Sequence, residues 1–218
     1  MKRSAQLLLF ASLLLLLGGQ QVFSQEKRDF YLWNTTYLQA PLSSQYSFRL
    51  SAKVQYLTSD DLREMTYLDA AVSRKMNDWL NLGLAFRTTQ HKKLTSDKME
   101  YRPQLVTTMH WASSKIKFST TNRPEYLMFS EGDNYGRVYH NIFVDFSSFE
   151  KWPKPYFGEE LFTKLNSDQL HLARIYGGLH VLERQHFRVD VYYVWQQLKV
   201  SGQWRGSDVA GLNLHFII

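Results

Sequence analysis

Residues 186–197, HFRVDVYYVWQQ, contain the pattern that decides the fold. Every second residue is apolar or aromatic, and these residues are Phe187, Val189, Val191, Tyr193 and Trp195. The residues between them are mostly polar or charged: His186, Arg188, Asp190, Tyr192 and Gln196. A period of two indicates a β-strand with two unlike faces. In a soluble sandwich the apolar face would be buried, whereas in a membrane barrel it would face lipid.

The same alternation recurs along the chain and favours the membrane barrel. In 45–57, 79–91 and 98–112, one set of alternate residues is largely apolar and the other is largely polar or charged. Aromatic residues tend to stand near the ends of the apolar faces, and we expect an aromatic girdle of Tyr46, Tyr56, Tyr101, Trp111, Tyr193 and Trp195. A soluble core gains nothing from this placement, so we expect the apolar faces to point outward to lipid.

The period-two segments that follow the N-terminal region predict an all-β fold. We expect strands near 30–40, 45–57, 65–76, 79–91, 98–112, 115–127, 137–148, 154–165, 169–182, 185–198 and 208–218. These are longer than the 5–6 residues typical of soluble sheets and suit membrane strands of about 9–11 residues. The predicted architecture is a closed antiparallel up-and-down transmembrane β-barrel of ten to twelve strands with a polar lumen. Bacterial single-chain barrels have an even number of strands, which favours ten or twelve over the eleven segments counted.

The connections between these segments alternate in length. Tight turns are expected at 41–44, 76–78, 112–115 and 182–185. Longer polar loops are expected at 58–64, 91–97, 129–136 and 201–208. Outer-membrane barrels have short periplasmic turns and longer outside loops, so the long loops are expected outside.

The N-terminal region predicts export. Lys2 and Arg3 precede a short apolar run, Leu7–Leu17, and Ser24 follows at a position that suits signal-peptidase cleavage. The run is shorter than the roughly 20 residues that a membrane-spanning helix needs. We expect residues 1–24 to be a cleaved signal peptide and residues 25–218 to form one domain.

Charge and cysteine content narrow the function classes. The net charge of +6 is not concentrated in a lysine/arginine block, so nucleic acid is not an expected partner. The chain has no cysteine, which excludes a lipid-attachment thiol and disulfide bonds. No cofactor is indicated.

Four scattered motifs resemble those of a bacterial family. They are DFYLWN at 29–34, NRPEY with Arg123 and Glu125, PYFGEELF with Glu159 and Glu160, and LARIYGGLHV with Arg174 and Gly178. The resemblance is to the outer-membrane barrel family catalogued as domain of unknown function 2490, common in Bacteroidetes-type genomes, and it covers most of the chain after residue 24. It implies a porin-like outer-membrane β-barrel of a Gram-negative bacterium and implies no known activity.

Charged residues on the strands should point into the lumen, because Arg or Lys at mid-depth on the lipid face costs about 2–4 kcal/mol. The expected lumen-lining charged residues are Arg49, Lys53, Arg87, Glu100, Arg102, Arg123, Glu125, Arg174, Arg188 and Asp190. One interpretation is a structural ladder of ion pairs that fills a narrow barrel. The other is a polar pore or a pocket for a small anionic solute, which the excess of arginine favours.

Four histidines are expected on the polar face toward the tight-turn ends of their strands: His110, His180, His186 and His215. If the turn after Leu182 has three residues, His180 and His186 face each other and form a candidate metal or proton site. The alternative is that these are ordinary polar side chains near the periplasmic rim.

No nucleophile–base constellation stands out, so the chain is not expected to be an enzyme. Serines beside the strands lie mostly in turns, at Ser43, Ser44, Ser113 and Ser114, and no His-x-Ser pair occurs. An outer-membrane lipid hydrolase or acyltransferase stays open as an alternative.

The most favoured function is that of a non-enzymatic outer-membrane β-barrel, either a structural or accessory barrel or a narrow channel for small polar solutes. The outside loops are expected to contact lipopolysaccharide or an outer-membrane protein partner, with Lys92 and Lys93 as candidate phosphate contacts. The main alternative is a soluble periplasmic or secreted lipocalin-like barrel that binds an apolar ligand.

Overall fold

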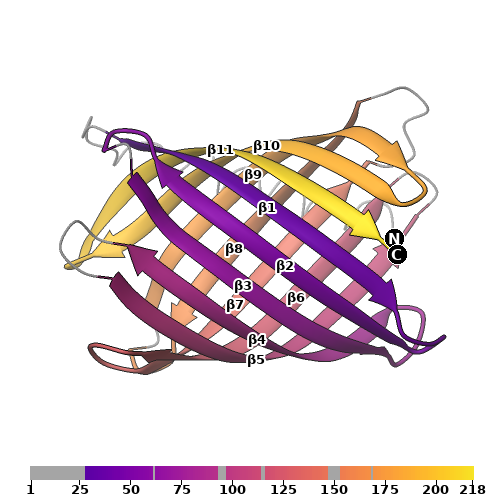
Figure 1. The fold of residues 1–218 in the computed structure, drawn as a ribbon, viewed down its shortest axis with the longest axis horizontal. Coiled ribbons are helices and arrows are strands. Elements are labelled where there is room, and N and C mark those ends of the chain that lie inside the picture. Colours follow the sequence, from indigo (N-terminus) through magenta and orange to yellow (C-terminus); the bar gives the residue numbers. More distant parts are fainter. Residues whose placement is uncertain (1–27, 61, 93–96, 114–115, 147–152, 168) are drawn as a thin grey trace, which may run out of the picture.

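The computed structural model describes residues 28–60, 62–92, 97–113, 116–146, 153–167 and 169–218. Its elements are all strands (Figure 1). They are β1 (Asp29–Pro41), β2 (Tyr46–Leu57), β3 (Leu62–Lys75), β4 (Leu80–Lys92), β5 (Asp97–Ala112), β6 (Lys117–Phe129), β7 (Tyr135–Asp145), β8 (Lys154–Lys164), β9 (Gln169–Arg184), β10 (Phe187–Val200) and β11 (Gln203–Ile217). Across these ranges, no helix has the length and apolar character needed to cross a membrane.

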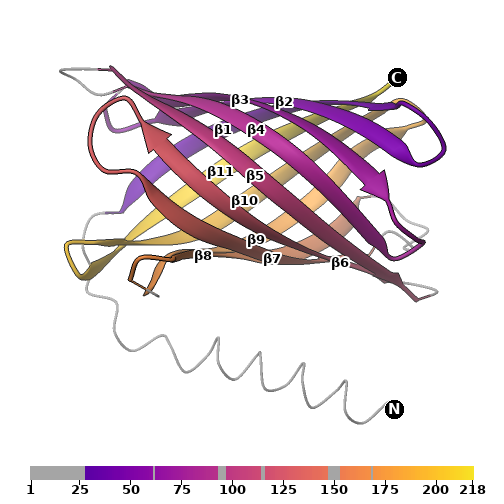
Figure 2. The ribbon, with the colours of Figure 1, turned by 90° about the horizontal axis from the view of Figure 1, so that it is seen from below.

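The strands close into a barrel in which each strand pairs with its sequence neighbours (Figures 1 and 2). All of these neighbouring pairs are antiparallel, and the ring closes through β1 and β11, which pair in parallel from Asp29↔Ser207 to Gln39↔Ile217. The expected all-β closed barrel is therefore confirmed.

The strand number explains the parallel pair. The described residues form eleven strands, which lies within the expected ten to twelve, but the expectation of an even number is wrong. In a ring of strands that alternate in direction, an odd number forces one neighbouring pair to run the same way. The even-number rule holds where both chain ends leave a barrel at the same rim, and here they do not.

We call the rim at which β1 begins the N-terminal rim, and the rim at which β11 ends the C-terminal rim. The N-terminal rim carries the start of β1 and the strand ends Leu57/Leu62, Lys92/Asp97, Phe129/Tyr135, Lys164/Gln169 and Val200/Gln203. The C-terminal rim carries the end of β11 and the strand ends Pro41/Tyr46, Lys75/Leu80, Ala112/Lys117, Asp145/Lys154 and Arg184/Phe187. The turns expected at 41–44, 76–78, 112–115 and 182–185 fall at the C-terminal rim, but the expected contrast in length is wrong. At the N-terminal rim two to five residues separate successive strands, and at the C-terminal rim eight residues separate Asp145 from Lys154.

The predicted long loop at 201–208 is wrong. Strand β11 begins at Gln203, and only Ser201 and Gly202 connect it to β10. Their φ angles of 51° and 83° are both positive, as in the type I′ turns that suit two-residue hairpins. The remaining predicted loop residues, from Gln203 to Asp208, continue the ladder with β10.

The distribution of side chains is the reverse of that in a soluble domain. Among the described residues, 29 large hydrophobic side chains are exposed and 12 hydrophobic residues are buried, whereas 17 polar or charged residues are buried. In β10, Asp190 and Tyr192 are buried inside the barrel, while Val191 and Tyr193 are exposed outside. The pattern that opened the sequence therefore has its apolar face on the outer wall and its charged face in the lumen.

Candidate functional site: the lumen

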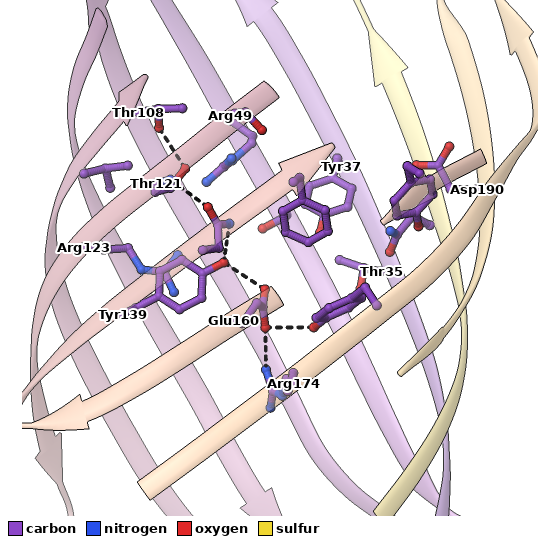
Figure 3. Close-up of a pocket in the computed structure, with 18 of the residues that line it drawn as sticks. Thr35, Tyr37, Arg49, Thr108, Thr121, Arg123, Tyr139, Glu160, Arg174 and Asp190 are labelled. Carbon is purple, nitrogen blue, oxygen red and sulfur yellow. Dashed lines mark hydrogen bonds and ion pairs between the residues drawn. The ribbon is translucent and has the colours of Figure 1, made fainter. Parts of the chain in front are cut away.

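The barrel encloses a cavity with a volume of about 860 Å³, whose wall is rich in cations (Figure 3). Nine basic side chains line it: Arg49, Lys53, Arg87, Arg102, Lys117, Arg123, Arg137, Arg174 and Arg188. Four acidic side chains line it: Asp78, Asp145, Glu160 and Asp190. The strands place these groups inside because alternate residues of a strand point to the same face.

All ten residues expected to line the lumen point to the inside of the barrel. Eight of them line the cavity: Arg49, Lys53, Arg87, Arg102, Arg123, Arg174, Arg188 and Asp190. The other two, Glu100 and Glu125, are buried and form ion pairs with the lining residue Arg102. Their carboxylates are therefore counter-charges for the lumen arginines.

The largest ion-pair cluster surrounds Glu125, which is 4% exposed. Its Oε1 accepts a hydrogen bond from Arg123 Nε at 2.5 Å, and its Oε2 accepts one from Arg137 Nη2 at 2.5 Å. Arg102 Nη1 lies 3.4 Å from the same Oε2 and links this cluster to Glu100. Several charge-assisted hydrogen bonds on one buried carboxylate hold these strands in a fixed arrangement.

Asp69 of β3 is the centre of a second cluster, on the neighbouring part of the wall. Arg87 Nε and Gln104 Nε2 each donate a hydrogen bond to Asp69 Oδ2 at 3.0 Å. Arg49 Nη2 lies 3.8 Å from Asp69 Oδ1, so this cation is only loosely paired. One carboxylate thus serves two arginines.

Glu160 of β8 is the centre of a third cluster of hydrogen bonds in the lumen (Figure 3). Arg174 Nη1 donates to Glu160 Oε2 at 3.1 Å, and the hydroxyl groups of Tyr139 and Tyr176 each donate at 2.8 Å. Arg174 Nε also donates to Gln196 Oε1 at 2.7 Å. The carboxylate of Glu160 therefore has its acceptor capacity largely filled.

Lys53 of β2 differs from the other lumen cations. It is 7% exposed, and its Nζ lies 3.0 Å from the centroid of the Trp33 ring, a cation–π arrangement. The guanidinium of Arg174 lies 4.7 Å from the same ring centroid. No ion pair among the described residues involves Lys53, and the contact made by its Nζ is with the ring of Trp33.

Near the C-terminal rim, two histidines contact the carboxylate of Asp190. His180 Nδ1 lies 2.6 Å from Asp190 Oδ1, and His215 Nε2 lies 2.8 Å from Asp190 Oδ2. His180 Nε2 also lies 3.1 Å from Asp145 Oδ2, and its ring stacks on Tyr156. These contacts form a belt from β7 to β11 along the inner wall.

The expected facing pair of His180 and His186 is not formed. His180 pairs in the ladder with Asp190, because a bulge shifts the register between Val189 and Asp190. His186 lies in the two-residue turn after β9, where its Nδ1 is 3.1 Å from the Ile217 carbonyl oxygen. In the described part of the chain, no group of three or more His, Asp or Glu side chains is arranged to hold a metal ion. The remaining histidine, His110, is exposed and lies 3.2 Å from Asn81.

The cavity opens at the C-terminal rim. Asp78 in the 76–79 turn, His110 and Lys117 are exposed residues that line it at this end. Lys75 donates a hydrogen bond to Asp78 and supplies a nearby positive charge, and both effects lower the pKa of the Asp78 carboxyl. The mouth therefore carries both signs of charge.

Toward the N-terminal rim the lumen is packed with side chains. Val194 and Val209 are 0% exposed, Leu127 is 1% exposed and Glu100 is 2% exposed. Val194 and Val209 belong to a core cluster with Trp33, Tyr156 and Tyr192. We call the packed region around Leu127, Val194 and Val209 the floor of the cavity.

The outer wall carries the expected girdle residues. Tyr46, Tyr101, Trp111 and Tyr193 are exposed, whereas Tyr56 and Trp195 are half-buried. Tyr193 lies at the middle of β10 rather than at an end of that strand.

Polar groups interrupt the outer wall across β6, β7 and β8. His140 Nδ1 lies 2.7 Å from Asn122 Oδ1, beside an apolar groove of about 510 Å³ lined by Met109, Trp111, Phe118 and Ile142 among others. Glu159 points outward because its neighbour Glu160 points into the lumen. The outer face is thus largely, but not wholly, apolar.

The described surface positions singled out from the sequence lie in connections or at a strand end. Ser43 and Ser44 lie in the turn before β2, Ser113 follows β5, and Lys92 ends β4. Lys93 and Ser114 lie outside the described residues.

Several lumen residues were missed by the sequence prediction: Asp69, Arg137, Asp145 and Glu160. The alternation of Asp69 with Leu68 and Ala70 in the expected strand 65–76 was a usable signal for the first of these. For the adjacent pair Glu159 and Glu160, one side chain must face outward, and the sequence alone does not decide which.

The comparisons with known proteins identify a family without an assigned activity. The family model described as "Protein of unknown function (DUF2490)" matches residues 30–207. No curated protein matches the chain.

Proposed function

The chain belongs to the DUF2490 family of proteins of unknown function, and from that premise we propose that it is a non-enzymatic β-barrel of the Gram-negative outer membrane. We propose that its signal peptide directs export and that its outer wall then inserts into lipid. Its lumen would serve either a structural role or the binding of small polar solutes rather than wide diffusion.

The observation that carries this proposal is the inverted distribution of side chains. The barrel exposes 29 large hydrophobic side chains among its described residues, and the outer face of β4 alone presents Leu82, Leu84 and Phe86. A soluble monomer rarely exposes contiguous apolar surface of this extent. A bilayer stabilises such a wall, because the closed ladder leaves no backbone edge unpaired in the hydrocarbon.

The shape of the lumen favours a closed barrel over an open porin. The side chains of Glu125, Leu127 and Val194 are buried inside the barrel. A barrel packed in this way is expected to pass little current. The proposed function is therefore a structural or solute-binding barrel, with at most a narrow path through the floor.

The charged lining weighs against the lipocalin-like alternative. An apolar ligand in this cavity would have to desolvate nine basic and four acidic side chains. A ligand pocket for an apolar molecule is instead lined predominantly by hydrophobic side chains.

Fractionation and gel mobility test the proposal. The chain with its N-terminal segment is expressed in a Gram-negative host, and unboiled and boiled samples of isolated outer membranes are compared on a detergent gel. We expect the protein in the outer membrane, with a faster band before boiling. Recovery of folded protein in the soluble periplasmic fraction would refute the membrane location.

Planar-bilayer recording then tests the state of the lumen. A closed barrel is expected to give no large, steady conductance after reconstitution. Porin-like conductance would contradict the packed floor and would favour a diffusion channel.

A further inference from the structure

We infer that the lumen contains a binding site for a small oxyanion with two or more negative charges, of the phosphate or sulfate type, centred on Lys53. The site is the part of the cavity wall around Lys53 and Trp33, with Arg174 over the same ring and Arg49 four residues before Lys53 on the inner face of β2. The inference concerns the inside of the closed barrel, so it holds whether the outer wall meets lipid or water.

The first argument is the balance of charge. Nine basic side chains line the cavity, and four acidic side chains line it with them. Three further carboxylates, those of Asp69, Glu100 and Glu125, lie behind the lining and pair with its arginines. The described cations therefore exceed the described carboxylates even when every counter-charge is included.

The second argument concerns Lys53, a buried cation without an ion-pair partner among the described residues. Asp69 is shared between Arg87 and the more distant Arg49, and the carboxylate of Glu160 is occupied by Arg174 and two tyrosine hydroxyls. Lys53 is more than nine-tenths buried and forms no ion pair with any described residue. Burial of an ammonium group without a counter-ion is strongly unfavourable, so an anion bound beside Lys53 would supply a counter-charge that no described carboxylate provides at ion-pair distance.

The third argument is that the site itself leaves two donors unpaired, although buried acceptors elsewhere in the lumen, Asp69 Oδ1 among them, also lack a hydrogen-bond partner. Nε of Arg49 and Nε1 of Trp33 are buried and have no hydrogen-bond partner. Both are donors, and the ammonium of Lys53 is a donor as well. A bound acceptor would satisfy these groups, whereas a cation or another donor would not. An oxyanion offers several acceptor oxygens, and arginine binds such groups through its planar fork of donors.

The residues of the site lie on the cavity wall, and Figure 3 shows Arg49, Tyr37, Glu160 and Arg174 among the side chains that line the cavity. The cavity of about 860 Å³ falls within the range of about 300–1,000 Å³ for small-molecule pockets. An anion would enter from the C-terminal rim, where His110 and Lys117 line the mouth.

Calorimetric titration tests the inference. Inorganic phosphate, sulfate and chloride are titrated into the purified folded barrel in an uncharged detergent at constant ionic strength. We expect saturable binding of phosphate and sulfate, but not of chloride. Lys53→Met keeps an unbranched side chain of similar size without the charge, and we expect it to weaken phosphate binding at least tenfold. Arg205→Gln, at an exposed position of β11, is the matched control and should bind like the unaltered protein.

A stability readout separates binding from a merely structural effect. Phosphate is expected to raise the unfolding temperature of the unaltered barrel and of Arg205→Gln, but not that of Lys53→Met. If Lys53→Met does not fold, Arg49→Gln serves in its place, with the same expected loss. Absence of phosphate and sulfate binding, or binding that survives both lumen substitutions, would overturn the inference. These outcomes are independent of the fractionation result that tests the membrane location.

Discussion

Arg137 lies directly opposite Glu125 in the β6–β7 ladder, and its guanidinium donates two hydrogen bonds to Glu125 Oε2, from Nη2 at 2.5 Å and from Nε at 3.0 Å. Both side chains are buried, at 6% and 4% exposure. Arg102 and Arg123 use the same carboxylate, so three arginines share Glu125, and Arg102 pairs with Glu100 as well.

Glu125→Gln is expected to destabilise the barrel by about 3–5 kcal/mol, because removal of one partner leaves buried charges uncompensated. Urea unfolding in lipid vesicles measures the change. The matched control is Glu183→Gln, which removes the rim partner of Lys154 at a carboxylate that is 44% exposed and should change stability by less than about 1 kcal/mol. Equal effects of the two substitutions would contradict the structural role of the Glu125 cluster.

Leu84→Arg tests the lipid-facing wall. Leu84 is 69% exposed on the outer face of β4, and an arginine there is expected to disfavour the inserted barrel by up to about 2–4 kcal/mol. The fraction of fast-migrating band after folding into vesicles measures this loss. Leu42→Arg places the same side chain at a similarly exposed position in a turn and should be tolerated. A barrel surrounded by water would tolerate both substitutions equally.

Gly178→Ala and its neighbour Gly177→Ala test the packing inside the barrel. A Cβ on Gly178 would fall on the ring of Tyr156, whereas a Cβ on Gly177 would meet its nearest atom, Phe157 Cε1, at 3.7 Å. We expect Gly178→Ala to destabilise the barrel by about 1–3 kcal/mol and Gly177→Ala to have little effect. The temperature at which the fast-migrating band is lost reports the difference, and a greater loss in Gly177→Ala would reverse the assignment of faces in β9.

Single cysteines test the orientation, since the chain has none of its own. Ser59→Cys lies at the N-terminal rim, and Ser44→Cys lies in an exposed turn at the C-terminal rim. If the N-terminal rim faces outward, a membrane-impermeant maleimide should label Ser59→Cys on intact cells. It should label Ser44→Cys only after permeabilisation. The opposite result would invert the barrel, and equal labelling of both in intact cells would be incompatible with a barrel that crosses the membrane.

The strand faces could be predicted from the sequence because the side-chain period of a strand is fixed. The alternation in 186–197 correctly predicts that Val191 faces outward and that Asp190 faces inward. The same argument succeeds in β2, where buried Ser51 and Lys53 alternate with the exposed Ala52 and Val54. Period two is a local property, so it needs no knowledge of which strands pair.

Features that depend on pairing could not be predicted in this way. Nothing in the residues of β1 or β11 marks them as parallel partners. The count of eleven segments was correct for the described residues, but the rule that such barrels have an even number of strands favoured ten or twelve instead. The expected facing of His180 and His186 failed because β9 continues to Arg184, so that His186 lies in the turn rather than in the β9–β10 ladder. The Ser201–Gly202 turn could have been predicted from the sequence, since such a dipeptide between alternating segments is a turn signal.

Because β1 and β11 run in the same direction, the chain enters the barrel at one rim and leaves it at the other. The thirteen residues of β1 rise about 3.3 Å each and tilt by roughly 40°, so the start of β1 and the end of β11 are separated by on the order of 30 Å of wall. A circularly permuted chain would need a linker of that length, either threaded through the packed floor or laid across the outer face. Proteins fused to the two ends would therefore sit on opposite sides of the barrel, which makes the chain a tether between two compartments if it spans a membrane.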